Sequence, residues 1–193
     1  MKKIVITFTF MIFFAISGIS QIIKPGIGFN YTSFNNDPLS YEKTGRLGFQ
    51  LGGSVAFGET IYFEPGIYWV RNNYELKDVD LNVDFKNDIS SIRIPLFVGI
   101  NVVGDAAEER NFHIFAGPAI SFVTDVNTGD TGLTTDDFNK FLWGANLGAG
   151  LSLWKMYVDV GYEWGLNDLF KDDPNNTKTK GLWVNVGFRL TFL

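Results

Sequence analysis

The last thirteen residues of the chain alternate strictly between two kinds of side chain. One face from 181 to 193 carries only apolar residues: Leu182, Val184, Val186, Phe188, Leu190 and Phe192. The other face carries Trp183, Asn185, Gly187, Arg189 and Thr191. A period of two predicts a β-strand, because successive side chains of a strand point to opposite faces. If most strands of the chain repeat this pattern, we expect the apolar faces to contact lipid.

The same alternation recurs along the chain and predicts eight strands. They are expected at 22–34, 46–57, 61–72, 90–101, 112–122, 141–153, 156–166 and 181–193. The links after the second, fourth and sixth strands are short, whereas those after the first, third, fifth and seventh are long and polar. An even strand count with alternating short turns and long loops is typical of outer-membrane barrels. The sequence therefore predicts an all-β fold, an eight-stranded antiparallel up-and-down transmembrane β-barrel over residues 21–193.

Two details of the strand pattern give further expectations. Pro65 lies inside the third predicted strand and removes one hydrogen bond of the ladder, so we expect a β-bulge there. The polar segment after that strand alternates from Leu76 to Phe85, which suggests that this hairpin continues into solvent.

Residues 1–20 have the features of a secretory signal peptide. Lys2 and Lys3 precede an apolar run at 4–16, and Gly18 and Ser20 supply small residues at a cleavage site. The apolar run is too short to span a bilayer as a helix. We expect cleavage after Ser20, which leaves one domain at 21–193.

The charge balance argues against nucleic acid as a partner. Without Lys2 and Lys3 the chain has 14 basic and 21 acidic residues, a formal charge of −7. A nucleic-acid-binding protein needs a basic face instead. The chain also has no cysteine, which excludes disulfides and thiolate metal sites.

The non-apolar faces of the predicted strands indicate which side of the sheet meets lipid. They consist largely of glycine, with six charged residues: Arg46, Glu64, Arg93, Asp159, Glu163 and Arg189. A soluble, lipocalin-like barrel would need a much more charged exterior. An arginine at mid-membrane on the lipid face costs roughly 2–4 kcal/mol. We therefore expect these six residues to form a charge network in a narrow lumen, with Asp159 and Arg189 in contact and Glu64 nearby; in the alternative, each meets water.

Aromatic residues collect near the ends of the predicted strands. Trp69, Trp143 and Trp164 lie toward the long loops, and Phe57, Phe63, Phe112 and Phe192 lie toward the short turns. Rings in these positions predict two aromatic girdles at the membrane–water interfaces.

Several short motifs resemble a known family. They are Phe63-Glu64-Pro65-Gly66-Ile67, Ile92-Arg93-Ile94-Pro95-Leu96, Phe115-Ala116-Gly117-Pro118, the segment 162–168, and Val186-Gly187-Phe188-Arg189. Together they resemble the PorT-like family of small outer-membrane β-barrel proteins of Bacteroidetes. The resemblance implies an outer-membrane barrel and transfers no catalytic residue.

The residues that carry chemistry do not form a convincing active site. His113, the one histidine, is predicted to point inward near the short-turn rim, with Ser121 and Ser152 poorly placed to act as its nucleophile. The acidic run from Asp78 to Asp84 offers oxygen ligands for calcium, but it lacks the glycine and terminal glutamate of an EF-hand loop. We expect solvated carboxylates there, no catalytic residue, no metal and no cofactor.

The sequence thus favours a non-enzymatic integral barrel in the outer membrane of a Gram-negative bacterium. We expect a filled lumen, a monomer, and contacts with outer-membrane lipid and with the barrel-assembly machinery. Four long loops would bind an unidentified ligand or protein, or support the envelope. The alternatives are a narrow pore for small solutes, a lipid-modifying enzyme, and a soluble periplasmic ligand-binding barrel.

Overall fold

A computed structural model describes residues 21–34, 41–78, 83–105, 108–127, 139–169 and 177–192, with the side chains at 34, 41–45, 74–78, 83–87, 127 and 192 outside this description. The strands are β1 (Gln21–Phe34), β2 (Tyr41–Gly45), β3 (Leu47–Gly58), β4 (Ile61–Asp78), β5 (Val83–Val103), β6 (Arg110–Asn127), β7 (Phe141–Leu153), β8 (Met156–Gly165), β9 (Thr179–Phe188) and β10 (Leu190–Phe192). The predicted signal peptide at 1–20 lies outside the described residues. No helix in the described part of the chain is long and apolar enough to cross a membrane.

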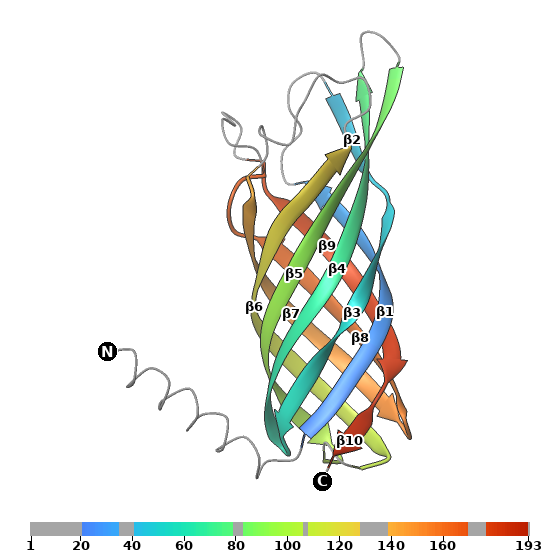
Figure 1. Cartoon of the computed structure of the whole chain (residues 1–193), viewed down its shortest axis with the longest axis vertical. Helices are drawn as coiled ribbons and strands as arrows, with labels where there is room; N and C mark the ends of the chain where they lie inside the picture. The colour runs from blue at the N-terminus through green and yellow to red at the C-terminus, as the bar shows by residue number, and fades with distance from the viewer. Residues whose placement is uncertain are drawn as a thin grey trace, which may run out of the picture.

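The strands form one closed antiparallel sheet (Figure 1). From β3 to β9 each strand pairs with the next one in sequence, β1 pairs with β3, and β1 also pairs with both β9 and β10, which closes the barrel. β2 and β3 both pair with β4, so they act as one interrupted strand, as do β9 and β10. The predicted eight-stranded antiparallel barrel is therefore confirmed.

The connections at one end of the barrel are tight. Glu59 and Thr60 link β3 to β4, and Trp154 and Lys155 link β7 to β8. Trp154 has a φ of 56°, the left-handed backbone conformation that a two-residue hairpin turn requires. These short turns mark the periplasmic end of an outer-membrane barrel.

At the opposite end, β4 and β5 extend well past the predicted strand ends. Their ladder runs from Ile61↔Ile100 to Asp78↔Val83, and β2 pairs with the same extension of β4. The expected continuation of this hairpin is thus confirmed.

The bulge expected at Pro65 does not occur. Glu64↔Phe97 and Tyr68↔Arg93 lie in one unbroken register of β4 with β5 on either side of the proline. The proline ring has a φ that suits an extended strand, and its missing N–H removes a hydrogen bond without inserting a residue. The irregularities of the sheet lie instead between β5 and β6, at Ser90/Ser91 and Asn101/Val103.

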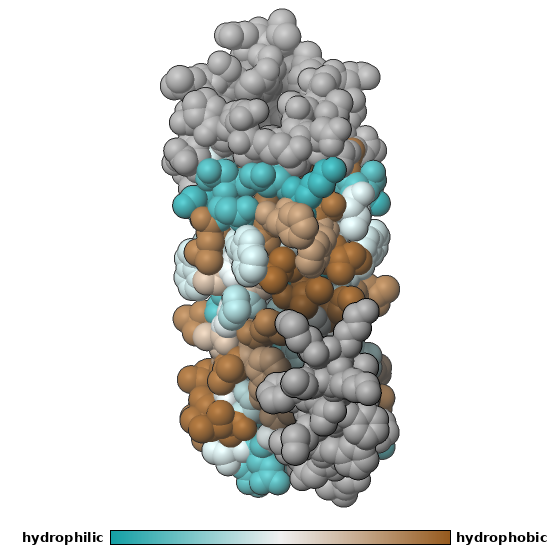
Figure 2. All heavy atoms as spheres, turned by 60° about the vertical axis from the view of Figure 1, so that its left-hand side comes forward, coloured by the Kyte–Doolittle hydropathy of each residue, from teal (hydrophilic) through white to brown (hydrophobic). Residues whose placement is uncertain are grey.

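The two faces of the sheet differ as the alternation predicted. Large apolar side chains point outward and are exposed, for example Ile27 at 61%, Leu147 at 55% and Leu190 at 46%. Figure 2 shows them as a hydrophobic belt with hydrophilic residues above and below it. Polar side chains point inward and are buried, among them Lys24, Gln50, Glu64, Arg93, His113, Asn146, Asp159 and Asn185.

Glycines on the inward face make room for large lumen side chains. A methyl carbon on Gly161 would lie 2.3 Å from the Trp183 ring, and one on Gly148 would lie 2.3 Å from the Phe115 ring. This explains why the lumen-facing positions are rich in glycine: eight strands enclose too little space for a bulky residue at every position.

Candidate functional site

The periplasmic half of the lumen holds a buried ionic cluster. Lys24 of β1 has its Nζ 3.1 Å from Oε1 of Glu64 on β4 and 2.8 Å from Oδ2 of Asp159 on β8. The three side chains are only 5–7% exposed. Ser54 donates a hydrogen bond of 2.5 Å to Oε1 of Glu64. Three strands that are distant in sequence are thus joined through one ammonium group.

His113 of β6 joins this cluster from the other side. Its Nε2 lies 2.9 Å from Oδ1 of Asp159, and its Nδ1 lies 2.7 Å from Oδ1 of Asn111. Gly150 of β7 pairs with both His113 and Asp159 and lies between them in the sheet. A methyl carbon on Gly150 would come within 2.0 Å of Asp159 and 2.3 Å of His113, so the contact across β7 requires glycine there.

The extracellular half of the lumen holds a second ion pair. Arg93 of β5 pairs with Glu163 of β8 and donates from Nη2 to Oδ1 of Asn146 at 2.6 Å. The same Asn146 oxygen accepts a hydrogen bond of 3.1 Å from Nε1 of Trp183. The Arg93 guanidinium also lies 5.5 Å from the centre of the Trp183 ring, within the range of a cation–π interaction.

Three rings, Phe97, Phe115 and Trp183, separate the two ionic groups; we call them the aromatic septum. Their centroids are 5.0 Å apart for Phe97–Phe115, 5.8 Å for Phe115–Trp183 and 6.1 Å for Phe97–Trp183. All three are buried, at 4–7% exposure. The septum touches both groups, since Phe115 lies 6.0 Å from the His113 ring and Trp183 lies beneath Arg93.

One small cavity lies on each side of the septum. The extracellular cavity has a volume of about 50 Å³, and its lining includes Asn30, Ser91, Arg93, Glu163 and Leu169. The periplasmic cavity has a volume of about 20 Å³, and its lining includes Lys24, Tyr62, Glu64, His113 and Arg189. The two cavities share no lining residue.

Leu169 covers the extracellular cavity from the segment between β8 and β9. It is 2% exposed and packs with Ile89 of β5. Its N–H donates to the carbonyl of Thr177 at 3.0 Å, and its carbonyl accepts from Asn139 at 2.9 Å. Strand alternation could not predict this role, because Leu169 lies in a predicted loop.

Five of the six predicted lumen charges lie in the barrel interior: Glu64, Arg93, Asp159, Glu163 and Arg189. The prediction for Arg46 is wrong, because Arg46 is exposed between β2 and β3. β1 pairs with β3 only as far as Tyr31↔Leu47, so Arg46 lies past the point where neighbouring strands enclose the inward face.

The predicted contact between Asp159 and Arg189 is replaced by others. Asp159 binds Lys24 and His113, whereas Arg189 donates from Nη1 to the backbone carbonyl of Glu108 at 3.2 Å. Arg189 interrupts the last strand near the periplasmic rim, and its side chain reaches the turn that carries Glu108. Lys24 is a lumen charge that was not predicted, although it lies in the same alternating phase as Gly26, Gly28 and Asn30.

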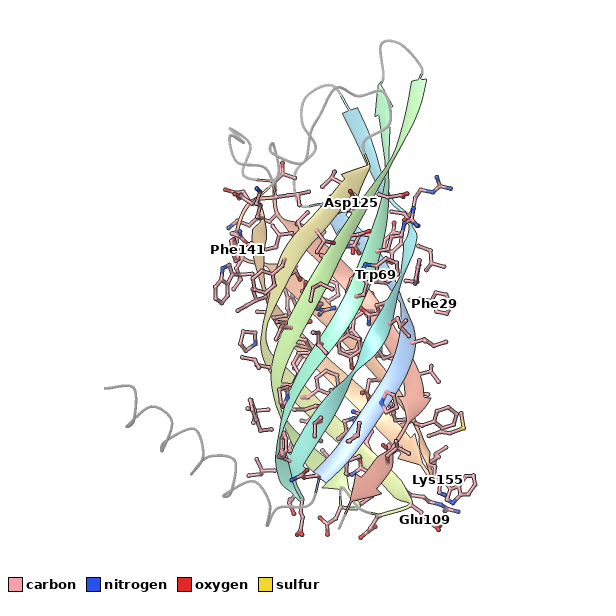
Figure 3. The ribbon with its side chains drawn as sticks, in the orientation of Figure 1. Phe29, Trp69, Glu109, Asp125, Phe141 and Lys155 are labelled. Atoms are coloured by element: carbon pink, nitrogen blue, oxygen red, sulfur yellow. The ribbon has the colours of Figure 1, made fainter. Side chains whose placement is uncertain are left out.

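The predicted girdle residues lie mainly on the outer surface. Trp69, Trp143 and Trp164 are 36%, 49% and 45% exposed, and Phe63 is 45% exposed. Phe57 and Phe112 are half-buried, and the side chain of Phe192 is outside the described residues. In Figure 3, Phe29 and Phe141 point away from the barrel wall, and Lys155 and Glu109 lie at the end opposite Asp125.

The residues considered for chemistry have structural surroundings. His113 is 3% exposed with both ring nitrogens in contact with oxygens, and Ser152 lines the same periplasmic cavity. In the part of the chain that the structure describes, no group of three or more His, Cys, Asp or Glu side chains is placed to hold a metal ion. The side chains of the proposed calcium loop, from Asp78 to Asp84, are outside the described residues.

Comparisons with known proteins agree with this architecture. The chain is similar in structure to the outer membrane protein OprG from Pseudomonas aeruginosa, with a TM-score of 0.61 and 14% identity over 90% of this chain and 96% of OprG. It is less similar to Ail, the attachment invasion locus protein of Yersinia pestis, solved with the heparin analogue sucrose octasulfate, with a TM-score of 0.47 and 12% identity over 89% of this chain and 99% of Ail. No functionally curated protein matches the chain in sequence.

A family model covers most of the chain. Residues 21–171 match the model described as outer membrane protein beta-barrel domain. Members of such a family are integral to the outer membrane of Gram-negative bacteria, so the alternative of a soluble periplasmic barrel is wrong. By sequence match, strand order and the direction of its apolar face, the chain belongs to the outer membrane protein beta-barrel domain family.

Proposed function

We propose that this barrel is a non-enzymatic, monomeric outer-membrane protein whose lumen is closed by side chains and whose extracellular segments bind a partner or ligand or support the envelope. The protein is exported with removal of residues 1–20 and inserted by the barrel-assembly machinery. The motifs shared with the PorT-like family support a place within that group, and they carry no role in secretion over to this chain.

The observation that carries the closed lumen is the aromatic septum between two separate cavities. Phe97, Phe115 and Trp183 are buried and in mutual contact. The larger cavity, at about 50 Å³, has room for only about four water molecules at 10–15 Å³ each. Hydrated ions need a continuous water-filled path, so buried rings in mutual contact between the two cavities support a closed lumen.

The surroundings of His113 support the absence of catalysis. A general base must reach the proton of a nucleophile. Here Asn111 and Asp159 occupy both ring nitrogens, so neither nitrogen is directed at a serine hydroxyl. This arrangement favours a structural role over that of a lipid-modifying enzyme.

Conductance measurements test the closed lumen. In planar lipid bilayers, we expect the wild-type barrel to show no steady conductance, because the septum interrupts the polar path. Insertion is checked separately by heat-modifiable migration on gels. A steady conductance that disappears when Glu163 or Asp159 is neutralised would favour the narrow-pore alternative, for which the polar cavities at both ends are the supporting observation.

Shortening the β4–β5 hairpin tests the role of the extracellular segments. The hairpin pairs from Asn73↔Asp88 outward to Asp78↔Val83 and is joined by β2, so it offers a three-stranded platform beyond the barrel. Replacing 74–87 by a two-residue turn is expected to preserve insertion and to abolish the capture of envelope or extracellular partners from intact cells. Unchanged capture by the shortened barrel would contradict a role for this hairpin.

A further inference from the structure

Asn101 and Asn111 form a chain of hydrogen bonds near the periplasmic turns. A backbone carbonyl at one end of this chain determines which group of each amide donates. Nδ2 of Asn101 donates to the carbonyl oxygen of Glu59. Nδ2 of Asn111 donates to Oδ1 of Asn101 at 2.7 Å and to the carbonyl oxygen of Gly104 at 3.4 Å. A carbonyl oxygen can only accept. Both amides must therefore direct their NH₂ groups toward the turns and leave the Asn111 oxygen facing the lumen.

The end of this chain determines which protons His113 carries. Oδ1 of Asn111 lies 2.7 Å from Nδ1 of His113 and can only accept, so Nδ1 must donate. Oδ1 of Asp159 lies 2.9 Å from Nε2, and an ionised carboxylate also only accepts, so Nε2 must donate as well. A histidine that donates from both nitrogens is an imidazolium ion. We propose that His113 is a buried proton-binding site whose two ring nitrogens both carry a proton.

The charges around His113 fit a second ring proton. Asp159 faces it from β8, Lys24 from β1, Glu64 and Tyr62 from β4, and Arg189 from the break after β9. Lys24 and a protonated His113 balance Glu64 and Asp159, while the guanidinium of Arg189 is held at the rim by the backbone carbonyl of Glu108. A proton on Oδ1 of Asp159 instead of on His113 is disfavoured, because the Lys24 ammonium group 2.8 Å from Oδ2 stabilises the ionised carboxylate.

The bound proton connects the lumen to the turns at the rim. Through Asn111 and Asn101 it joins the ionic cluster to Gly104 in the β5–β6 link and to Glu59 in the β3–β4 turn. If the ring lost its Nδ1 proton, a lone pair would face the Asn111 oxygen, and two acceptors 2.7 Å apart repel each other. Asn111 would then rotate, and its bonds to Asn101 and Gly104 would break. The closed periplasmic end thus depends on an occupied proton site.

Nitrogen NMR of the intact barrel tests the proposal directly. The chain has one histidine, so ¹⁵N-histidine labelling gives a single ring spin system without assignment. In detergent micelles at pH 7, we expect both ring nitrogens to show imidazolium-type shifts with attached protons. One protonated and one unprotonated ring nitrogen in the wild type would overturn the proposal, whatever the variants do.

A matched pair of variants tests whether Asn111 determines the second ring proton of His113. Asn111→Leu removes the acceptor at Nδ1, and we expect it to lose the second ring proton at pH 7. Gln50→Leu makes a similar polar-to-apolar change in the lumen, where Gln50 bonds to Asn185 rather than to His113, and should leave the imidazolium signal intact. An imidazolium signal that persists in folded Asn111→Leu contradicts the claim that the Asn111 oxygen holds the second ring proton of His113. If that variant does not fold, the wild-type spectrum alone decides.

Discussion

Replacing Lys24 by methionine is expected to lower the free energy of unfolding of the barrel by about 3–5 kcal/mol, the range for removing one partner of a buried ion pair. The loss is large because the Lys24 ammonium group pairs with two buried carboxylates at once, those of Glu64 and Asp159. Without it, Glu64 loses its cation and Asp159 keeps only the contact with His113, in a lumen with little water. Urea unfolding in phospholipid vesicles, followed by tryptophan fluorescence, measures the change.

Two comparisons separate lost charge from lost packing. Lys155→Met removes an exposed lysine at the β7–β8 turn and should have almost no effect. The triple variant Lys24→Met/Glu64→Gln/Asp159→Asn removes the repelling charges and should recover part of the loss. If Lys24→Met is as stable as Lys155→Met, Lys24 is not the main counter-ion of the cluster.

Replacing Leu147 by arginine is expected to cost roughly 2–4 kcal/mol, the range for arginine on the lipid face at the bilayer midplane. Leu147 is the central residue of β7, points outward and is 55% exposed. A guanidinium group there must enter hydrocarbon or distort the bilayer, because the barrel wall separates it from the polar lumen. The same unfolding experiment in vesicles measures the cost.

The matched control for this change is Leu153→Arg. Leu153 ends the same strand on the same outer face, at the short-turn rim, and is 61% exposed. Near the interface the expected cost falls to roughly 0–1 kcal/mol. Equal costs at the two positions would show that the depth of Leu147 in the membrane is not as described.

The sequence predicted the strands and their faces because both are local properties. Whether Leu147 points outward follows from its phase in β7, and that phase is set by neighbours two residues away. Two predictions failed because the phase of a residue in its strand does not by itself determine its surroundings. Arg46 has an inward phase but lies past the end of the enclosing β1–β3 ladder, and Pro65 was given a bulge that the register does not contain.

The partners inside the lumen were less predictable than the residues that enter it. Glu64, Arg93, Asp159 and Glu163 are identified as inward from alternation. Asp159 was nevertheless assigned to Arg189, on the neighbouring strand, whereas it binds Lys24 and reaches His113 across the glycine of an intervening strand. The alternation also places Lys24 on the inward face, since it precedes Gly26 and Gly28 in the same phase.

By itself, the sequence determined that the chain forms a lipid-facing barrel of eight antiparallel strands, because alternation, turn residues and loop lengths are written along the chain. Only the tertiary structure decided which charges pair, where the aromatic septum lies and that Leu169 covers the extracellular cavity. The physical reason is that lumen contacts join strands across the barrel. Those distances depend on the register and tilt of all the strands together, and no short stretch of sequence specifies them.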